Sequence, residues 1–372
     1  MTAPDRAGPA SLPQPAGGAA SAHDPFTPRA ALAPGDRAPD FLLADETGAF
    51  HRFSERARGN PILLLLLAGD PATVAAASAA TAASGIGGRG ADVIAIRVGG
   101  PPPPAERGER ITWLDDAKGK ILEGFADAAG LPRGRPAALL LDANQRILDL
   151  AAGGDLLEWA RLRIAALPAP VATQGLGLVA PVLIVPNVLE PAACRALIER
   201  WEQVGHEEGS VASLVDGAEV QRVYHAIKKR RDHAIQDPAL LQSLIATIGR
   251  RIAPELDRAF GFRRFKFDRF IVTCYNAERG DYFRRHRDNA SPGTADRRFA
   301  LTLNLNSDEY EGGDLLFPEY GPHHYRPPTG GAILFSCGLL HEALPVTRGR
   351  RFTLLSFLRD PAGATRDART TP

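Results

Sequence analysis

Residues 274–289 of this 372-residue chain read CYNAERGDYFRRHRDN, and they carry a histidine and an aspartate two positions apart, His286 and Asp288. Two residues at this spacing on an extended strand point to the same side of a sheet. A further histidine, His341, follows 55 residues after His286. Two imidazoles and one carboxylate are the ligand set that holds a ferrous ion on one face and leaves three coordination positions open. The sequence therefore offers these three residues as iron ligands.

An arginine follows ten residues after His341. Arg351 stands at the start of the apolar run 352–358, where a guanidinium is able to enter a barrel interior. A buried guanidinium needs an anion, and a carboxylate bound through two parallel hydrogen bonds is its natural partner. Thr353, two residues further on, is placed to add a hydroxyl hydrogen bond from the same face. The alternatives are a solvated His-x-Asp loop pair and a surface charge pair of Arg350 and Arg351 on a strand edge.

Two helical patterns and then many short strands surround these residues. The first helix opens at Glu190-Pro191, and the second covers 238–260 with apolar residues at three- and four-residue steps. The β-rich runs are 265–275, 299–305, 314–317, 332–337 and 351–358. Helices followed by many strands indicate a helix-buttressed β-sandwich or barrel.

The N-terminal half has a different pattern. Short apolar runs alternate there with helix-like or turn-rich stretches, and this alternation indicates an α/β layer. The runs are 41–43, 62–67, 93–96 and 137–141, and a helix follows through 156–164. The composition predicts a disordered arm at 1–31, an α/β domain at 32–167, a linker at 168–180, a second domain at 181–362 and a tail at 363–372.

Composition limits the partners and the location. The net charge of +1 gives no global field for nucleic acid or an anionic membrane. We read the basic run Lys228-Lys229-Arg230-Arg231 as a solvated segment, so no nucleic-acid partner is expected. The longest apolar run, 62–67, is too short to cross a bilayer. Three widely spaced cysteines exclude a disulfide framework and a CxxC site, which favours a reducing, cytoplasmic compartment.

Together, the C-terminal motifs resemble the Fe(II)- and 2-oxoglutarate-dependent dioxygenases, and specifically their prolyl-hydroxylase branch. The resemblance covers about residues 181–360 and implies a double-stranded β-helix (jelly-roll) fold. It rests on 274–289, on Arg298, on LNLN at 303–306, on EGGDLLF at 311–317 and on 341–351. Some prolyl hydroxylases have a tyrosine where Asn304 stands here.

The resemblance implies Fe(II) on His286, Asp288 and His341, with Arg351 holding the distal carboxylate of 2-oxoglutarate and Tyr275 contacting the same cosubstrate. The activity implied is hydroxylation of a C–H bond by dioxygen with release of succinate and CO2, with ascorbate as a reductant. A peptidyl proline is the expected substrate. The alternatives are a free amino acid or other small metabolite as substrate, and a non-catalytic protein that binds iron or a partner.

Residues 32–167 resemble a redoxin, the thioredoxin-like fold of the peroxiredoxins. The resemblance rests on PGDRAPDF at 34–41, on the central strand 62–67 and on RPA at 135–137. The peroxidatic cysteine expected after the central strand is missing, because no cysteine precedes Cys194. Thiolate chemistry needs a thiol, so a thiol peroxidase is disfavoured. We expect a redoxin-shaped domain that serves solubility or binds a protein partner.

Overall fold

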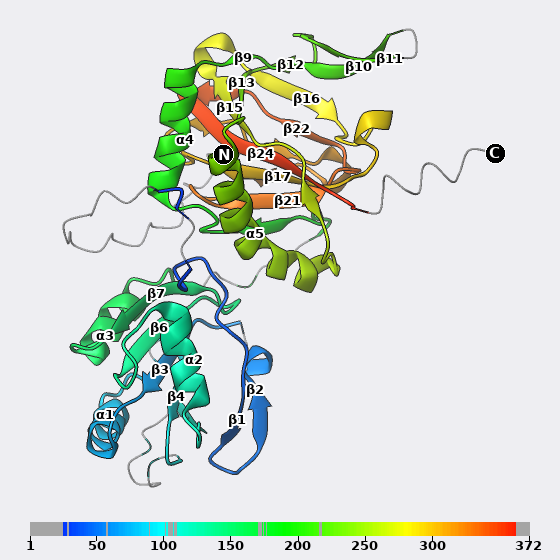
Figure 1. Ribbon diagram of the computed structural model, residues 1–372. Coiled ribbons are helices and arrows are strands. Elements are labelled where there is room, and N and C mark those ends of the chain that lie inside the picture. The colour runs from blue at the N-terminus through cyan, green and yellow to red at the C-terminus, as the bar shows by residue number, and fades with distance from the viewer. Residues whose placement is uncertain are drawn as a thin grey trace, which may run out of the picture. The chain divides into compact units, whose positions relative to one another are not determined.

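The described part of the chain forms two compact units that divide after Thr173 (Figure 1). This computed structural model describes residues 25–27, 30–56, 59–88, 90–100, 102, 107, 110–169, 173, 175, 177–215 and 218–361. Most of the predicted arm 1–31, and the whole of the predicted tail 363–372, lie outside the described residues. The described residues 25–27 belong to the second unit together with those after Thr173.

The N-terminal unit is built on a seven-stranded sheet in the order β2-β1-β5-β4-β3-β6-β7. Its strands are β1 Leu42–Asp45, β2 Phe50–Arg52, β3 Ile62–Leu67, β4 Asp92–Arg97, β5 Ile111–Asp115, β6 Ala137–Leu141 and β7 Ile147–Ala152. Its helices are α1 Pro71–Ala83, α2 Lys120–Ala129 and α3 Leu156–Ala165, with a short 3-10 turn at Phe53–Arg56. Strands β3, β4 and β5 run parallel, whereas β3 pairs antiparallel with β6.

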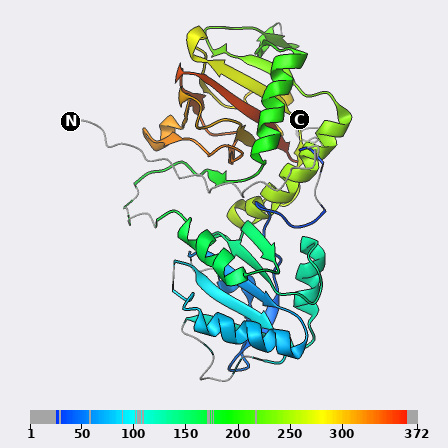
Figure 2. The ribbon, with the colours of Figure 1, turned by 90° about the vertical axis from the view of Figure 1, so that its left-hand side faces the viewer.

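The central strand β3 is buried on both faces, which explains its uninterrupted apolar sequence. Ile62, Leu64 and Leu66 pack with α2 on one face. The alternate leucines of the strand pack with α1 and α3 on the other face. The helices therefore cover both sides of the sheet, as Figure 2 shows. This arrangement confirms the predicted α/β layer, and the redoxin relationship stays a prediction.

The C-terminal unit contains a large antiparallel sheet in the order β8-β21-β17-β24-β15-β13-β9, with β14 paired to β24. Its strands are β8 Leu183–Val185, β9 Glu207–Glu208, β13 Arg231–Ala234, β14 Lys266–Phe267, β15 Ile271–Asn276, β17 Arg297–Asn304, β21 Ala332–Ser336 and β24 Arg350–Arg359. Helices α4 Pro191–Val204 and α5 Pro238–Phe260 cover one face of this sheet and bury the predicted apolar positions against it (Figure 1).

A smaller antiparallel sheet lies against the other face, in the order β12-β16-β22-β19-β20. Its strands are β12 Lys228–Lys229, β16 Tyr282–His286, β19 Leu315–Leu316, β20 His324–Tyr325 and β22 His341–Ala343. Two further pairs are β10 Val211–Val215 with β11 Ala218–Arg222, and β18 Glu311–Gly312 with β23 Val346–Arg348. Short 3-10 turns cover Ala277–Arg279, Pro292–Thr294 and Pro318–Tyr320. The two facing sheets agree with the predicted jelly-roll arrangement.

Side chains at positions 351–354 of β24 alternate between the two faces of the large sheet. On β24, Phe352 and Leu354 join the core under the helices. Arg351 and Thr353 face the small sheet and line a cavity there. This period of two turns the polar side chains of a buried strand toward one face.

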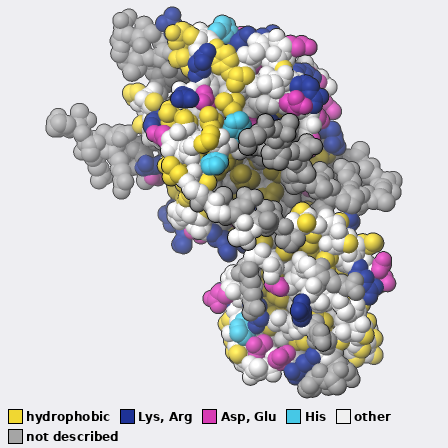
Figure 3. Space-filling view, turned by 180° about the vertical axis from the view of Figure 1, so that it is seen from behind, with side chains coloured by type: hydrophobic (Ala, Val, Ile, Leu, Met, Phe, Trp, Pro, Cys, Tyr) yellow, Lys and Arg dark blue, Asp and Glu magenta, His cyan; other side chains and the backbone are white. Residues whose placement is uncertain are grey.

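Charged side chains of both signs are interspersed on the surface, and Figure 3 shows this on one face. No helix in the described part of the chain is long and apolar enough to cross a membrane.

Candidate metal and cosubstrate site

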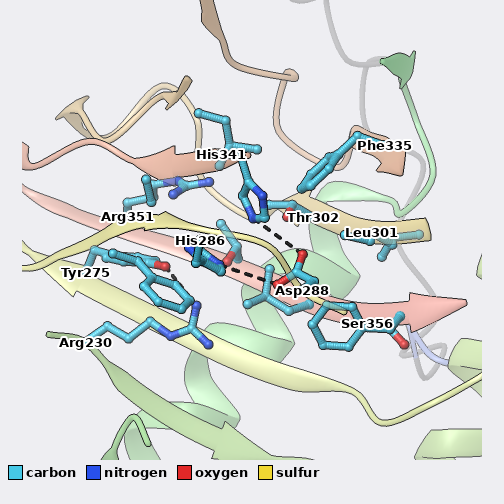
Figure 4. A pocket seen from close by; sticks show the side chains of 17 residues that line it. Arg230, Tyr275, His286, Asp288, Leu301, Thr302, Phe335, His341, Arg351 and Ser356 are labelled. Carbon is cyan, nitrogen blue, oxygen red and sulfur yellow. Dashed lines mark hydrogen bonds and ion pairs between the residues drawn. The ribbon is translucent and has the colours of Figure 1, made fainter. Parts of the chain in front are cut away.

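Two histidines of the small sheet and one aspartate just beyond it come together, and these are the three residues that the sequence predicts as iron ligands. His286 ends β16 and His341 begins β22, and the two residues are direct partners in the antiparallel ladder. The Nε2 atom of His286 lies 3.4 Å from Oδ1 of Asp288, and Nε2 of His341 lies 3.4 Å from Oδ2 (Figure 4). One ligand atom from each residue lies within 4.8 Å of the others. This spacing fits a single metal ion.

Asp288 reaches this position from a turn, and the simple expectation of one extended strand needs a correction. Strand β16 ends at His286, and Asp288 lies two residues beyond it. The backbone N–H of Asp288 donates to the carbonyl of Cys337 at 3.0 Å. This bond ties the turn that contains Asp288 to the segment that precedes His341. The histidine and the aspartate therefore meet through the turn and the ladder together.

Backbone carbonyls orient both imidazoles. Nδ1 of His286 lies 2.7 Å from the carbonyl of Arg284, and Nδ1 of His341 lies 3.0 Å from that of Leu339. A protonated Nδ1 donates to such a carbonyl and leaves the Nε2 lone pair for a metal. Burial lowers the pKa of His341, although Asp288 opposes this effect. Burial alone raises the pKa of Asp288, but His341 and His286 outweigh it and the pKa is lowered. Neutral imidazoles beside a carboxylate are the form that binds metal.

An arginine from the large sheet faces the same cavity. Arg351 is 2% exposed, and its guanidinium carbon lies 5.3 Å from the ring centre of Tyr275, its partner in the β15–β24 ladder. Within the described residues it forms no ion pair, and its Nε has no hydrogen-bond partner. The Nη2 group donates to Oδ1 of Asn304 at 3.4 Å. A buried guanidinium without a carboxylate is costly, so this cavity fits an anionic ligand.

The remaining neighbours of Arg351 hold it in place. Asn304 is buried and donates to the hydroxyls of Ser307 and Tyr310, each at 3.0 Å. The backbone of Gly313 has φ +68°, and a Cβ there would lie 3.0 Å from Cδ of Arg351. Thr353 lines the cavity, and its hydroxyl forms a 2.7 Å hydrogen bond with that of Thr273. Its expected contact with the cosubstrate stays a prediction.

Two connected spaces adjoin the triad. A cavity of about 60 Å³ is lined by the three candidate ligands together with Tyr275 and Arg351. A groove of about 1240 Å³ shares His286 and Asp288 with it and opens between the sheets. The small space suits a compact cosubstrate, and the groove suits a larger substrate.

Comparison with known proteins agrees with this geometry. Residues 270–359 match the family model of the 2OG-Fe(II) oxygenase superfamily, and this segment contains the whole candidate triad and Arg351. The C-terminal unit is a 2-oxoglutarate- and Fe(II)-dependent oxygenase domain. The oxygenase domain is also similar to a PKHD-type hydroxylase of Xanthomonas campestris pv. campestris, 29% identical over 192 residues, which cover 48% of this chain and 81% of that protein.

Two further similarities are more distant or shorter. A PKHD-type hydroxylase of Synechococcus elongatus is 38% identical over 95 residues, which cover 23% of this chain and 43% of that protein. A solved structure of a Pseudomonas putida prolyl-4-hydroxylase is 21% identical and covers 48% of this chain and 92% of that chain, with a TM-score of 0.36.

The sequence reading of Lys228–Arg231 as a solvated run is wrong for two of its residues. Lys228 and Arg230 are each 5% exposed, and both line the groove of the oxygenase domain. Arg230 donates to the hydroxyl of Tyr275 at 2.8 Å, as Figure 4 shows. The sequence signal for these two residues is their alternation: Lys228, Arg230 and Asp232 follow one another at steps of two along an extended segment. In the structure, Lys228 and Arg230 both pair with Asp232.

Asp232 is expected to be essential for the stability of the oxygenase domain. It accepts from Lys228 at 3.0 Å and from Arg230 at 2.8 Å, and these cations outweigh burial and lower its pKa. Asp232→Asn leaves two buried cations without a carboxylate, which should cost about 3–5 kcal/mol in the free energy of unfolding. Urea denaturation measures this loss. The control Asp257→Asn removes an exposed pair with Arg263 and should cost less than about 1 kcal/mol, so equal losses would contradict the expectation.

Proposed function

We propose that His286, Asp288 and His341 bind the iron of the oxygenase domain and that Arg351 pairs with the distal carboxylate of 2-oxoglutarate. The observation that carries this proposal is the position of Arg351, a buried guanidinium with no carboxylate partner among the described residues, in the same cavity as the triad. Tyr275 and Thr353 line that cavity as well, and we propose that their hydroxyls contact the cosubstrate.

When bound, iron and 2-oxoglutarate together activate dioxygen to hydroxylate a C–H bond, with release of succinate and CO2. The chain supplies orientation and a dry environment for this chemistry. The ring of Phe335 packs edge-on against His341, with centroids 4.6 Å apart, and Phe283 stacks on His286 at 3.5 Å. His341 is buried from water, and the two rings hold the imidazoles in the orientation that the backbone carbonyls set.

We propose a peptidyl proline as the substrate. The groove beside the triad, at about 1240 Å³, has room for several residues of an extended peptide. The names of the relatives as hydroxylases support the reaction type. A free amino acid or small metabolite is the second candidate, because the same groove also admits a small molecule beside His286 and Asp288.

The test is to incubate the full chain with Fe(II), 2-oxoglutarate, ascorbate and proline-containing peptides or cell metabolites. We expect succinate release and a mass gain of one oxygen on a peptide. A gain confined to a small metabolite would select the second candidate. A chain that binds iron and releases no succinate would be a non-catalytic binding protein, and the proposal would be rejected.

For the N-terminal unit we propose a redoxin-type fold that has lost thiol chemistry and binds a protein partner. Helix α1 follows β3, the predicted central strand, and its N-cap is Asp70, which accepts from the backbone of Thr73.

The three cysteines are all buried in the C-terminal unit, which supports the proposed reducing, cytoplasmic location. We also propose ascorbate as the reductant that keeps the iron ferrous.

We expect the C-terminal unit to retain 2-oxoglutarate turnover when it is produced without the N-terminal unit. A fragment of residues 174–372 should still release succinate from 2-oxoglutarate, because all proposed ligand and cosubstrate residues lie within it. The full chain should consume no hydrogen peroxide in a thiol-coupled assay, because thiolate attack begins that reaction. Succinate release is measured for the fragment, the full chain and a fragment carrying Asp288→Ala as the inactive control. Peroxide consumption by the full chain, or a folded iron-binding fragment without turnover, would contradict this division.

A further inference from the structure

The buried charged residues beside the groove include more cations than carboxylates. Asp232 is the only carboxylate within ion-pair distance of Lys228 and Arg230 in the described part of the chain, and it serves both cations. Its carboxylate oxygens accept from Nζ of Lys228 at 3.0 Å and from Nε and Nη2 of Arg230 at 2.8 and 3.2 Å. Two buried cations that share one carboxylate leave a surplus positive charge, which is costly in a protein interior unless an anion offsets it.

Neighbouring carboxylates of the groove do not remove this surplus. Glu208 forms a two-point ion pair with Arg279, and Asp268 is shared by Arg297 and Arg359. Glu207 lies opposite Asp232 on β9, but its side chain is exposed and lies beyond ion-pair distance of both buried cations. Solvent screens an exposed charge of this kind.

A third cation adds to the positive field. Arg269 lines the same groove, is exposed and forms no hydrogen bond or ion pair with any described residue. Burial, the charge of Arg230 and, more weakly, the charge of Arg269 lower the pKa of Lys228 to about 8, against the opposing effect of Asp232. Lys228 and Arg269 line the same groove, so one ligand in the groove is able to contact both.

These cations lie next to the metal site. Nζ of Lys228 is 5.4 Å and the guanidinium carbon of Arg230 is 5.5 Å from the ring centre of Phe283, and that ring stacks on His286. Lys228 lines the groove but not the small cavity, whereas Arg230 lines both. A ligand that contacts Lys228 thus occupies the groove, beside the cosubstrate rather than in its place.

We propose that Lys228, with Arg230 and Arg269, binds a carboxylate of the substrate and thereby selects acidic substrates for the oxygenase domain. This inference rests on the proposed hydroxylase function. The ammonium of Lys228 has three donors, of which two are used, by the carbonyl of Ser210 at 2.8 Å and by Asp232. The buried group of Lys228, Arg230 and Asp232 carries one surplus positive charge, and Lys228 keeps one remaining donor, which together match a carboxylate. The carboxylate belongs to an acidic peptide side chain or to a free amino acid.

The experiment compares substrates that differ only in charge, with the full chain loaded with Fe(II) and 2-oxoglutarate. Peptide libraries with a central proline carry Glu, Gln or Lys at the flanking positions, and N-acetylproline is compared with its amide as the small-molecule arm. The readouts are the mass gain of one oxygen and the succinate released. We expect the Glu library, or N-acetylproline over its amide, to be preferred by about tenfold, since one charge-assisted contact is worth about that factor.

Variants connect this preference to the residues. Lys228→Met should abolish most of the preference and leave the KM for 2-oxoglutarate unchanged, and it should fold because Arg230 and Asp232 then balance one to one. Arg269→Gln, on an exposed residue, should weaken the preference by about threefold. Lys266→Met is the matched control, because Lys266 is an exposed lysine outside the groove.

Three results would overturn the inference. The first is equal use of Glu, Gln and Lys peptides together with equal use of N-acetylproline and its amide. The second is an acidic preference that Lys228→Met does not change. The third is the absence of stimulation by any carboxylate while uncoupled succinate release continues, which rejects the inference and leaves the oxygenase function standing. No succinate release under any condition would instead reject the proposed function itself.

Discussion

Asp288→Ala is expected to abolish stoichiometric binding of Fe(II) and to lower 2-oxoglutarate turnover by about a hundredfold or more. The carboxylate is the single anion of the triad, and it lies 3.4 Å from Nε2 of both histidines. Loss of residues that merely support metal ligands already costs about 10- to 100-fold in affinity or activity, so the loss of a ligand should cost at least as much. His286→Ala should behave in the same way. The measurement is iron per chain after anaerobic desalting, followed by succinate release.

Controls separate the loss of a ligand from the loss of fold. Asp308→Ala and His323→Ala change exposed residues of the same types and should leave iron binding intact. The open coordination positions of this ligand set also predict that a chelator inactivates the wild-type chain and that added Fe(II) restores it. Full iron binding and turnover in both Asp288→Ala and His286→Ala would remove the metal assignment.

The second large effect is expected at Arg351. Arg351→Ala should raise the KM for 2-oxoglutarate by between about thirtyfold and a few thousandfold, because truncating one partner of a buried ion pair costs about 2–5 kcal/mol. Iron binding should be unaffected, since Arg351 lies on the large sheet and the triad on the small one. Succinate release as a function of 2-oxoglutarate concentration measures the effect.

Two substitutions test whether the effect is specific. Arg351→Lys should restore part of the affinity, because lysine supplies the charge without the planar fork that binds a carboxylate at two points. Arg350→Ala removes the neighbouring arginine, which is exposed and pairs with Glu202, and should leave the KM unchanged. If Arg351→Ala has the same 2-oxoglutarate dependence as wild type, the buried guanidinium has another role.

Much of the site could be predicted because its residues belong to short, ordered motifs. The sequence predicts His286, Asp288 and His341 as one candidate ligand set, and their ligand atoms lie within 4.8 Å of one another, although Asp288 lies in a turn beyond the strand. Arg351 could be predicted because a charged residue at the start of a long apolar strand either lies at an edge or needs a partner inside. The buried strand β3 is equally clear, since only a doubly covered strand tolerates six consecutive apolar residues.

The rest depends on tertiary contacts that local sequence does not encode. Lys228 and Arg230 look solvated when the run is read as a block of charge, and only their pairing with Asp232 shows why they are buried. The turn that carries Asp288 is fixed by the carbonyl of Cys337, which is 49 positions away in the chain. Asn304 accepts a hydrogen bond from Arg351, and this contact exists because β17 and β24 are neighbours in the sheet. The local sequence does not show which strands are neighbours.

The placement of the triad on one sheet and of Arg351 on the facing sheet couples ligand occupancy to the opening of the fold. In the proposed site, the three candidate ligands beside the small sheet would hold iron, and a cosubstrate in contact with both iron and Arg351 would connect the two layers across the cavity. A ligand that binds only the closed state stabilises it in proportion to the logarithm of its concentration over its Kd. Amide hydrogen exchange in β16 and β24 should therefore slow together when Fe(II) and 2-oxoglutarate are both present, because the two sheets then open as one cooperative unit.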